Sequence, residues 1–464
     1  MTSVETRTSA QPSSLEATVR AQQPAVLADL ARLVAVESVS ADPGRAALVQ
    51  ASADAVVGLL RNLGCPDVQV VSAGGGRPAV IARFPAPQGQ PTVCLYAHHD
   101  VQPEGDPALW ASEPFEATER DGRLFGRGTA DDKGGLAVHL AALRAFDGKP
   151  PVGVTLFIEG EEEVGSPTLA PLLEEQRDLL DADVFVIADS SNWAVGQPAF
   201  TTSLRGMGDC VVELRTLDHA IHSGSYGGVA PDALTALCRL LATLHDDRGD
   251  VAVAGLATTT PPDLEYPEER LRAESGLLDG VQQIGTGTVV ERLWCKPAIA
   301  VIALDATPVD RASNTLAPRA RAKISVRLAP GDDATAAMAK VVEHLHAHVP
   351  WGAEITVHAG ESGHGTLVPF AGAHAEAARA AFTQAWGVPP VFIGQGGSIP
   401  MVTDFRRAFP EATILVTAVG DPDTRAHGAN ESLHLGDFAA ACVAETLMLQ
   451  GIADLAGGGS ATAG

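Results

Sequence analysis

Residues 91–103 read PTVCLYAHHDVQP, an apolar run that ends in two histidines and an aspartate. Three similar runs lie further along the chain: GVTLFIEG (153–160), ADVFVIAD (182–189) and EATILVTAVG (411–420). Segments this rich in Val, Ile, Leu and Phe are typical of strands that are covered on both faces. Helical patterns separate the first three runs, at 134–146 and 166–180. The alternation predicts an α/β domain whose mostly parallel sheet is flanked by helices.

The long gap before the last apolar run has a different pattern. Between residues 203 and 361 the predicted elements follow the order β, α, β, β, α, β, with helices at 231–246 and 333–349. This order is typical of a small two-layer α+β domain. We therefore expect an insertion that divides the α/β domain into two pieces of chain. The predicted boundaries are 1–202 for the first piece, 203–361 for the inserted domain and 362–464 for the second piece.

The composition excludes several partners. The 57 acidic and 32 basic side chains give a formal net charge of −25 at pH 7. Such a charge repels phosphate backbones and anionic membrane surfaces, so we expect neither nucleic acid nor a membrane as a partner. The six cysteines are scattered without a CxxC pair, and the first residues lack the basic and apolar regions of a signal peptide. These features predict a cytoplasmic protein with reduced thiols.

Polar side chains with metal-binding potential follow the first apolar run. Side chains alternate along a strand, so His98 and Asp100 share one side while His99 points to the other. A carboxylate two residues from an imidazole can accept its second ring proton, which fixes the tautomer that presents the other nitrogen to a metal. Taken alone, the stretch YAHHDVQP is equally compatible with a solvated surface loop.

Two acidic segments have the same ambiguity. GRGTADDKGG (126–135) places Asp131 and Asp132 just before a helix, and FIEGEEEVGS (157–166) places three glutamates directly after a strand. The adjacent aspartates would repel a phosphate and GxxxxGK[ST] is absent, so cations are the expected ligands of the first segment. Alone, either segment could be a helix N-terminus or a solvated acidic turn.

The positions of these segments favour one shared site. Asp189 ends another apolar run, and His427 follows the run that ends in Gly420. Ligands of open α/β sheets collect at the carboxyl ends of the strands. So many carboxylates at one rim would repel one another unless cations compensate their charge. Because two imidazoles are among the candidates, zinc or a similar transition ion is favoured over calcium or magnesium.

The combination of motifs resembles the carnosinase-like dipeptidases of the dinuclear zinc aminoacylase, dipeptidase and carboxypeptidase superfamily (peptidase clan MH). The motifs occur in the family's order: HxDVQP (98–103), GRGxxDDKGG (126–135), EExGS (162–166), HSGxxGG (222–228), RLAP (327–330), GGSIP (396–400) and AHxxNE (426–431). The resemblance covers nearly the whole chain. It implies a zinc-exopeptidase-like catalytic domain, formed by 1–202 and 362–464, and an inserted lid domain, formed by 203–361, through which a homodimer assembles.

The resemblance also implies metal ligands. Two zinc ions per subunit would be bridged by Asp131, and manganese or cobalt could replace them. His98 and Asp189 would complete one site, and Glu163 and His427 would complete the other. A cis peptide bond would follow Asp131.

Further roles are implied for catalysis and substrate binding. Glu162 would be the general base for attack by a metal-activated water on the amide bond, and Asp100 would orient His98. His222 would reach the partner subunit's site to stabilise the oxyanion. The substrate, a dipeptide or another small amide that bears a carboxylate, would be held by four residues: Asn314, Arg327, Gly397 and Ser398.

Two alternatives remain beside the dipeptidase. Gly394 and Gln395 stand where many of these relatives carry Arg-Glu, so an acidic partner for a free substrate amine is missing. An N-acyl or N-carbamoyl amino acid amidohydrolase on the same scaffold is therefore the first alternative. A catalytically silent binding protein is the second, which the complete ligand set and the presence of Glu162 disfavour. GxSxG and HExxH are absent, which argues against a serine hydrolase and a single-zinc protease of that type.

Overall fold

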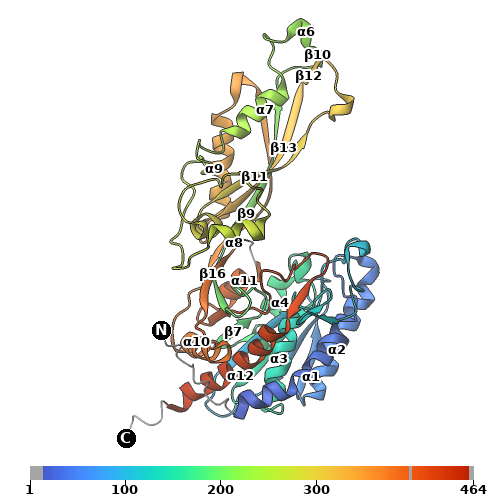
Figure 1. The fold of residues 1–464 in the computed structure, drawn as a ribbon, viewed down its shortest axis with the longest axis vertical. Helices are drawn as coiled ribbons and strands as arrows, with labels where there is room; N and C mark the ends of the chain where they lie inside the picture. The colour runs from blue at the N-terminus through green and yellow to red at the C-terminus, as the bar shows by residue number, and fades with distance from the viewer. Residues whose placement is uncertain (1–13, 397–399, 459–464) are drawn as a thin grey trace, which may run out of the picture. The chain divides into compact units, whose positions relative to one another are not determined.

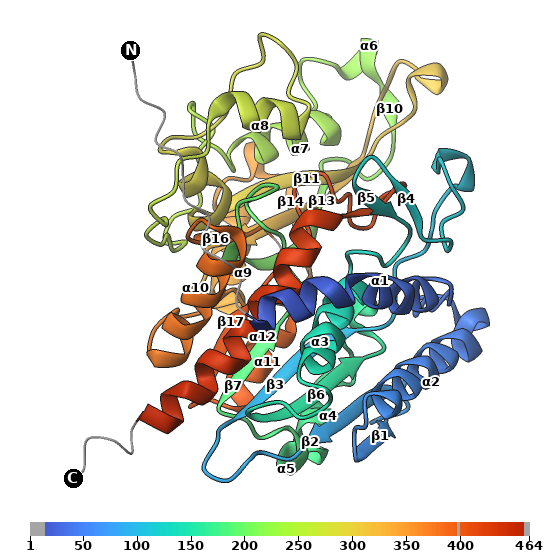
Figure 2. The same cartoon turned by 60° about the horizontal axis from the view of Figure 1, so that its bottom comes forward.

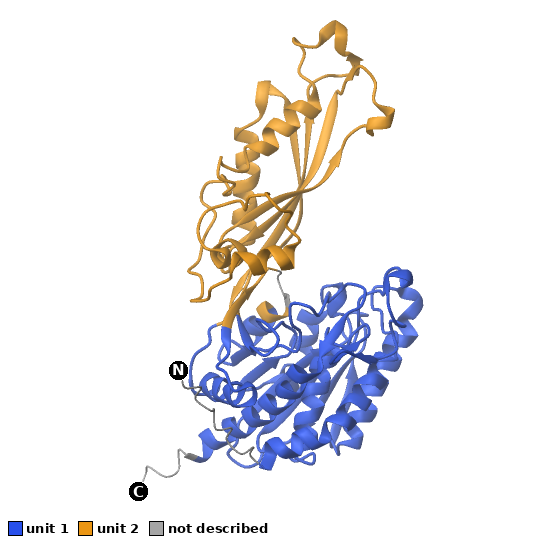
Figure 3. Cartoon of the chain, in the orientation of Figure 1, with its two compact units in different colours: residues 1–201, 369–391, 404–464 blue, residues 202–368, 392–403 orange. Residues whose placement is uncertain are grey.

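The computed structural model describes residues 14–396 and 400–458, and these form two compact units (Figure 3). The first unit contains Met1–Thr201, Pro369–Val391 and Asp404–Gly464, and the second contains Thr202–Val368 and Phe392–Thr403. The chain thus leaves the first unit after Thr201, returns at Pro369, and contributes a second, short segment to the second unit before it returns again at Asp404.

The first unit is built on a six-stranded sheet with the order β1-β2-β6-β3-β7-β17. Its strands are β1 (Asp67–Val71), β2 (Ala79–Phe84), β3 (Thr92–His98), β6 (Gly153–Glu159), β7 (Val184–Ile187) and β17 (Thr413–Val416). The pairs β6-β3, β3-β7 and β7-β17 are parallel, while β1 and β2 add two antiparallel pairings at one edge. Every residue of β6 and β7 is buried, as expected for strands covered on both faces. The mostly parallel sheet predicted from the four apolar runs is confirmed.

Helices cover this sheet. They are α1 (Ser14–Val34), α2 (Ala46–Asn62), α3 (Lys133–Ala145), α4 (Leu169–Glu175), α5 (Arg177–Leu180), α10 (Ala373–Trp386), α11 (Pro400–Ala408) and α12 (Leu435–Gly458). Helix α3 contacts β3 and packs with α1 and α12 over one face (Figure 2). Since α3 starts directly after Asp132, its packing fixes the preceding acidic loop relative to the carboxyl end of β3.

Helix α12 is long and apolar enough by composition to cross a membrane. However, 67% of its apolar window is buried within the protein. It also carries Glu445, whose carboxylate lies 2.8 Å from Nδ1 of the buried His139 on α3. These contacts are those of a core helix.

Short strands form two further sheets. One three-stranded sheet contains β4 (Thr118–Arg120), β5 (Arg123–Phe125) and β18 (Ser432–His434), and another contains β8 (Ala199–Leu204), β15 (Thr366–Leu367) and β16 (Val391–Gln395). Pairing of β18 with β5 joins the C-terminal loop that carries His427 to the segment before Asp131.

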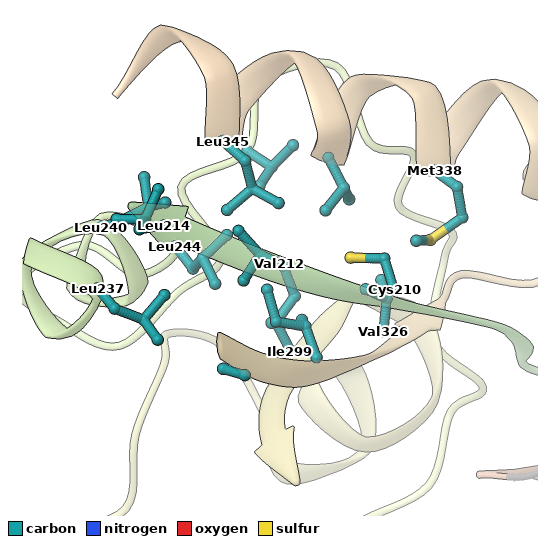
Figure 4. Packing of buried hydrophobic residues seen from close by; sticks show 14 of the residues in the cluster. Cys210, Val212, Leu214, Leu237, Leu240, Leu244, Ile299, Val326, Met338 and Leu345 are labelled. Carbon is teal, nitrogen blue, oxygen red and sulfur yellow. The ribbon is translucent and has the colours of Figure 1, made fainter. Parts of the chain in front are cut away.

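The second unit contains a four-stranded sheet with the order β11-β13-β9-β14. Its strands are β9 (Gly206–Arg215), β11 (Ala298–Asp305), β13 (Arg319–Leu328) and β14 (Glu354–Gly363). Helices α7 (Ala233–Ala242) and α9 (Ala334–Ala347) pack on this sheet (Figure 1). Residues of β9 alternate between buried and partly exposed positions, so one face supplies the core around Val212 and Leu214 (Figure 4). The two-layer α+β architecture expected of the insertion is confirmed. The smaller elements are β10 (Ile221–His222), α6 (Ser223–Tyr226), α8 (Glu268–Ser275) and β12 (Thr315–Leu316).

Candidate metal centre

His98 is the last residue of β3 and lies at the carboxyl end of the sheet in the first unit. Its ring is fully buried, and its Nε2 atom lies 3.1 Å from Oδ1 of Asp131. The same nitrogen lies 4.0 Å from Oε2 of Glu162 and 4.0 Å from Oδ2 of Asp189. The loop before α3, the turn after β6 and the end of β7 therefore converge on the end of β3.

Asp131 lies between two histidines. Its second carboxylate oxygen, Oδ2, is 3.1 Å from Nε2 of His427, which is also 3.3 Å from Oε2 of Glu163. One oxygen of Asp131 therefore faces His98 and the other faces His427. The peptide bond between Asp131 and Asp132 is cis, as the resemblance implies.

The candidate ligand atoms form two overlapping groups. Those of His98, Asp131 and Glu163 lie within 4.8 Å of one another, and so do those of His98, Glu162 and Asp189. Together with His427, these residues come from segments separated by more than three hundred positions in the chain, and all of them belong to the first unit.

Asp100 supports this cluster from behind. Its Oδ1 atom lies 3.4 Å from Nδ1 of His98, and its two oxygens accept the backbone N–H groups of Glu162 (3.3 Å) and Glu163 (3.2 Å). Burial acts to raise the pKa of Asp100, but the hydrogen bond and charge of His98 outweigh it, so the pKa lies below its usual value. His99 points away, as predicted: its Nε2 donates to the carbonyl of Pro78 at 2.9 Å.

The electrostatics of the cluster favour a cation. Burial raises the pKa of Asp189 to about 6, and burial together with the charge of Asp131 raises that of Glu163 to about 9. Burial and the charge of Asp189 raise the pKa of Glu162 well above its ordinary value. A divalent cation favours the ionised form of every carboxylate around it. The mixture of imidazole nitrogens and buried carboxylates therefore fits divalent transition-metal binding.

A buried ion pair that the sequence analysis does not predict holds two loops of the site together. Glu431 accepts a hydrogen bond from Nη1 of Arg127 at 2.6 Å and from the backbone N–H groups of Gly128, Ala130 and Asp131 at 3.0–3.1 Å. Both charged side chains are essentially inaccessible to solvent. Arg127 also donates to the carbonyl of Gly428, next to His427. The only sequence signal is that Arg127 lies in the motif GRGxxDDKGG and Glu431 lies in the motif AHxxNE.

The other predicted site residues do not belong to the described part of the first unit. His222, Asn314 and Arg327 belong to the second unit. His222 is exposed at the end of β10, and the backbone of Ser223 donates to the carbonyl of Asn314 at 2.9 Å. Gly397 and Ser398 lie outside the described residues.

An α/β domain interrupted by an inserted domain, with imidazole and carboxylate groups gathered at the carboxyl ends of its strands, is typical of a metal-dependent hydrolase. The chain belongs to the peptidase family M20/M25/M40, whose family model matches residues 94–450. It is accordingly a metallopeptidase.

Individual relatives agree with this assignment. The cysteinylglycine-S-conjugate dipeptidase of Corynebacterium striatum is 36% identical over 370 residues, which cover 77% of this chain and 80% of that protein. The human beta-Ala-His dipeptidase is 28% identical over 384 residues, with coverage of 78% and 75%. The solved structure of human carnosine dipeptidase 1 has a TM-score of 0.76 at 25% identity and covers 96% of this chain and 100% of that chain.

Proposed function

We propose that this protein is a dinuclear metallodipeptidase that cleaves the amide bond of dipeptides or small peptides with a free C-terminal carboxylate. The observation that carries this proposal is the position of the Asp131 carboxylate, with one oxygen 3.1 Å from His98 and the other 3.1 Å from His427. A carboxylate with an imidazole at each oxygen is suited to bridge two ions.

The proposed ligand sets are those that the resemblance implies, and the short distances around Asp131 and His98 support them. His98, Asp189 and Asp131 would hold one ion, and Glu163, His427 and Asp131 would hold the other. Zinc is proposed as the ion, and manganese or cobalt could replace it because imidazole and carboxylate ligands accept all three. Bound divalent cations polarise the amide carbonyl and lower the pKa of water.

Glu162 is the proposed general base. Its carboxylate is close to the cluster, and its backbone N–H is held by Asp100. Its side chain remains 19% exposed, so a substrate can approach it. Glu162 would accept a proton from the attacking water at its carboxylate and deliver that proton to the leaving amino nitrogen.

The proposed substrate contacts come from the second unit. Arg327 would bind the terminal carboxylate of the substrate, since a guanidinium can donate two parallel hydrogen bonds to it. Asn314, Gly397 and Ser398 are proposed to complete this contact. The relatives support a dipeptide, since those from C. striatum and human are dipeptidases by name. We also propose a cytoplasmic location, which agrees with the absence of disulfide bonds among the six cysteines, all of which the structure describes.

One observation keeps an N-acyl or N-carbamoyl amino acid amidohydrolase as the second candidate. A Cβ atom at Gly394 would lie 2.7 Å from both Cβ and Cγ of Trp294, so no larger side chain fits there without rearrangement. The arginine that many relatives carry at this position therefore does not fit here, and the acidic residue that they carry at the next position is replaced by Gln395, which has no charge to pair with a free substrate amine. A substrate without a free amine would tolerate this difference better than an unblocked dipeptide.

Metal analysis combined with a substrate panel tests the proposal. We expect two equivalents of zinc per chain and hydrolysis of unblocked dipeptides at higher kcat/KM than their N-acetyl or N-carbamoyl counterparts. Chelation should abolish turnover, and zinc, manganese or cobalt should restore it. Faster cleavage of the acylated amino acids would move the assignment to the second candidate. Metal uptake without turnover of any compound would leave only a binding protein.

His222 is expected to act across a homodimer formed by the inserted domain. Its Nδ1 accepts the N–H of Gly224 at 3.0 Å, which leaves Nε2 as the donor for an oxyanion. His222→Ala should lower turnover roughly 100-fold, the usual cost of losing one such donor, without changing the metal content. The nearby exposed His219 supplies the control, and His219→Ala should behave like the unmodified protein.

Mixing subunits tests whether His222 acts in trans. A heterodimer of His222→Ala and Asp131→Ala chains should contain one site with intact ligands that receives an intact His222 from the partner. Activity should therefore rise well above that of either variant alone. If the mixture stays as inactive as its components, the contribution across the dimer is wrong.

A further inference from the structure

The segment after β3 continues in an extended course past His98. The backbone N–H of Val101 donates to the carbonyl of Ser38 at 3.0 Å, and Val101 forms a parallel bridge with Val39. This pairing keeps the segment extended, so His98, Asp100 and Gln102 fall on the same side. The first is a candidate ligand, and the second holds the backbone of the Glu162–Glu163 turn.

Gln102 makes three hydrogen bonds to a single residue, Glu163. Its backbone N–H donates to Oε1 at 3.1 Å, its side-chain Nε2 donates to Oε2 at 2.7 Å, and Nε2 also lies 3.2 Å from the Glu163 carbonyl oxygen. Both carboxylate oxygens of Glu163 are therefore engaged from one side, while His427 lies 3.3 Å from Oε2. The Glu163 side chain is 3% exposed.

The adjacent Glu162 is held differently. Asp100 fixes its backbone N–H, but in the part of the chain that the structure describes its carboxylate accepts no hydrogen bond and lies 4.0 Å from Nε2 of His98. Asp100 thus accepts the backbone N–H groups of both glutamates, whereas Gln102 holds the carboxylate of Glu163 alone. A metal ligand requires a fixed carboxylate, whereas a base that accepts and releases a proton must move between two partners.

We infer that Gln102 is a positioning residue that assigns Glu163, rather than Glu162, to metal binding. This inference rests on the proposed two-metal function. The side-chain amide nitrogen can only donate, so it directs the Glu163 carboxylate into one orientation, in which its remaining lone pairs face Asp131 and His427. A glutamate at position 102 has the same shape as glutamine, but its carboxylate oxygen would face the carboxylate oxygen of Glu163, and neither can donate a hydrogen bond. A methionine has similar length and removes the donor without adding charge.

Cobalt titration of the metal-free protein tests this role without using activity. The unmodified protein should bind two Co²⁺ equivalents, each with its own visible absorption bands. In Gln102→Glu and Gln102→Met, one equivalent should bind as before, and the other should bind roughly 10- to 100-fold more weakly with altered bands. Gln69 on β1 is exposed and remote, so Gln69→Met should leave both equivalents unchanged.

The outcomes separate this inference from the proposed function. If both Gln102 variants bind two equivalents with unchanged affinity and spectra, or lose both equivalents to the same degree, Gln102 does not position Glu163 specifically. If the unmodified protein binds only one equivalent, the two-metal proposal itself fails. Thermal unfolding of the metal-free variants identifies a folding defect, and the uncharged methionine variant decides the matter if the glutamate variant does not fold.

Discussion

Glu162→Gln is expected to reduce turnover by roughly 10²- to 10⁴-fold, the usual contribution of a positioned general base, while both metals stay bound. The amide keeps the size and shape of the carboxylate but cannot accept a proton from water. The backbone hydrogen bond from Glu162 to Asp100 does not involve the altered group. Steady-state kinetics on the preferred dipeptide and elemental analysis of the same preparation provide the two measurements.

A comparison with the next residue makes this experiment decisive. Glu163→Gln should lower both metal content and turnover, because Glu163 is the proposed ligand and its carboxylate lies 3.3 Å from His427. The exposed Glu174 on α4 offers a neutral control, and Glu174→Gln should change neither quantity. If Glu162→Gln loses metal to the same extent as Glu163→Gln, the division of roles between the two residues is wrong. Unchanged turnover in Glu162→Gln would remove Glu162 as the base.

The catalytic fold was predictable where the sequence pattern is local. The four apolar runs form β3, β6, β7 and β17, because a strand buried on both faces needs a continuous apolar sequence. Strands β1 and β2 were not predicted. They extend the sheet by antiparallel pairing, and β1 is an edge strand with partly exposed residues, so its sequence DVQVV lacks the continuous apolar signal.

The first helix contains a proline in its interior. Helix α1 begins at Ser14 and continues past Pro24. Its apolar face packs on α3 and α12, and this tertiary packing outweighs the local cost of a proline inside a helix.

The convergence of the candidate site was predictable from topology, whereas its support was not. His98 and Asp189 each lie at the carboxyl end of a parallel strand or directly after it, so the sheet brings them to one rim. The pair of Arg127 and Glu431 is different, because its members are separated by 304 residues and neither lies in a periodic segment. Only the folded chain shows that these two charged side chains form an ion pair that is buried from solvent. Loss of one partner should therefore destabilise the protein strongly.

Arg127→Met is expected to destabilise the metal-free protein by about 3–5 kcal/mol, because it leaves the Glu431 carboxylate buried without its cation. The hydrogen bonds from Arg127 to the carbonyls of Pro103 and Gly428 are lost as well. Chemical denaturation measures this free energy of unfolding. The exposed pair Arg215–Glu354, with a separation of 3.6 Å, supplies the contrast, and Arg215→Met should cost no more than about 1 kcal/mol.

A double variant distinguishes an unpaired charge from a simple loss of packing. In Arg127→Met with Glu431→Gln neither charge of this pair remains, and the glutamine oxygen can still accept the N–H groups of Ala130 and Asp131, which lie 3.0 and 3.1 Å from Glu431 Oε1. The double variant should therefore be more stable than Arg127→Met alone. Additive losses would mean that the two charges do not depend on each other. The hydrogen bonds from these N–H groups to residue 431 hold the loop that presents Asp131. Metal affinity should therefore fall together with stability in Arg127→Met and recover in part in the double variant.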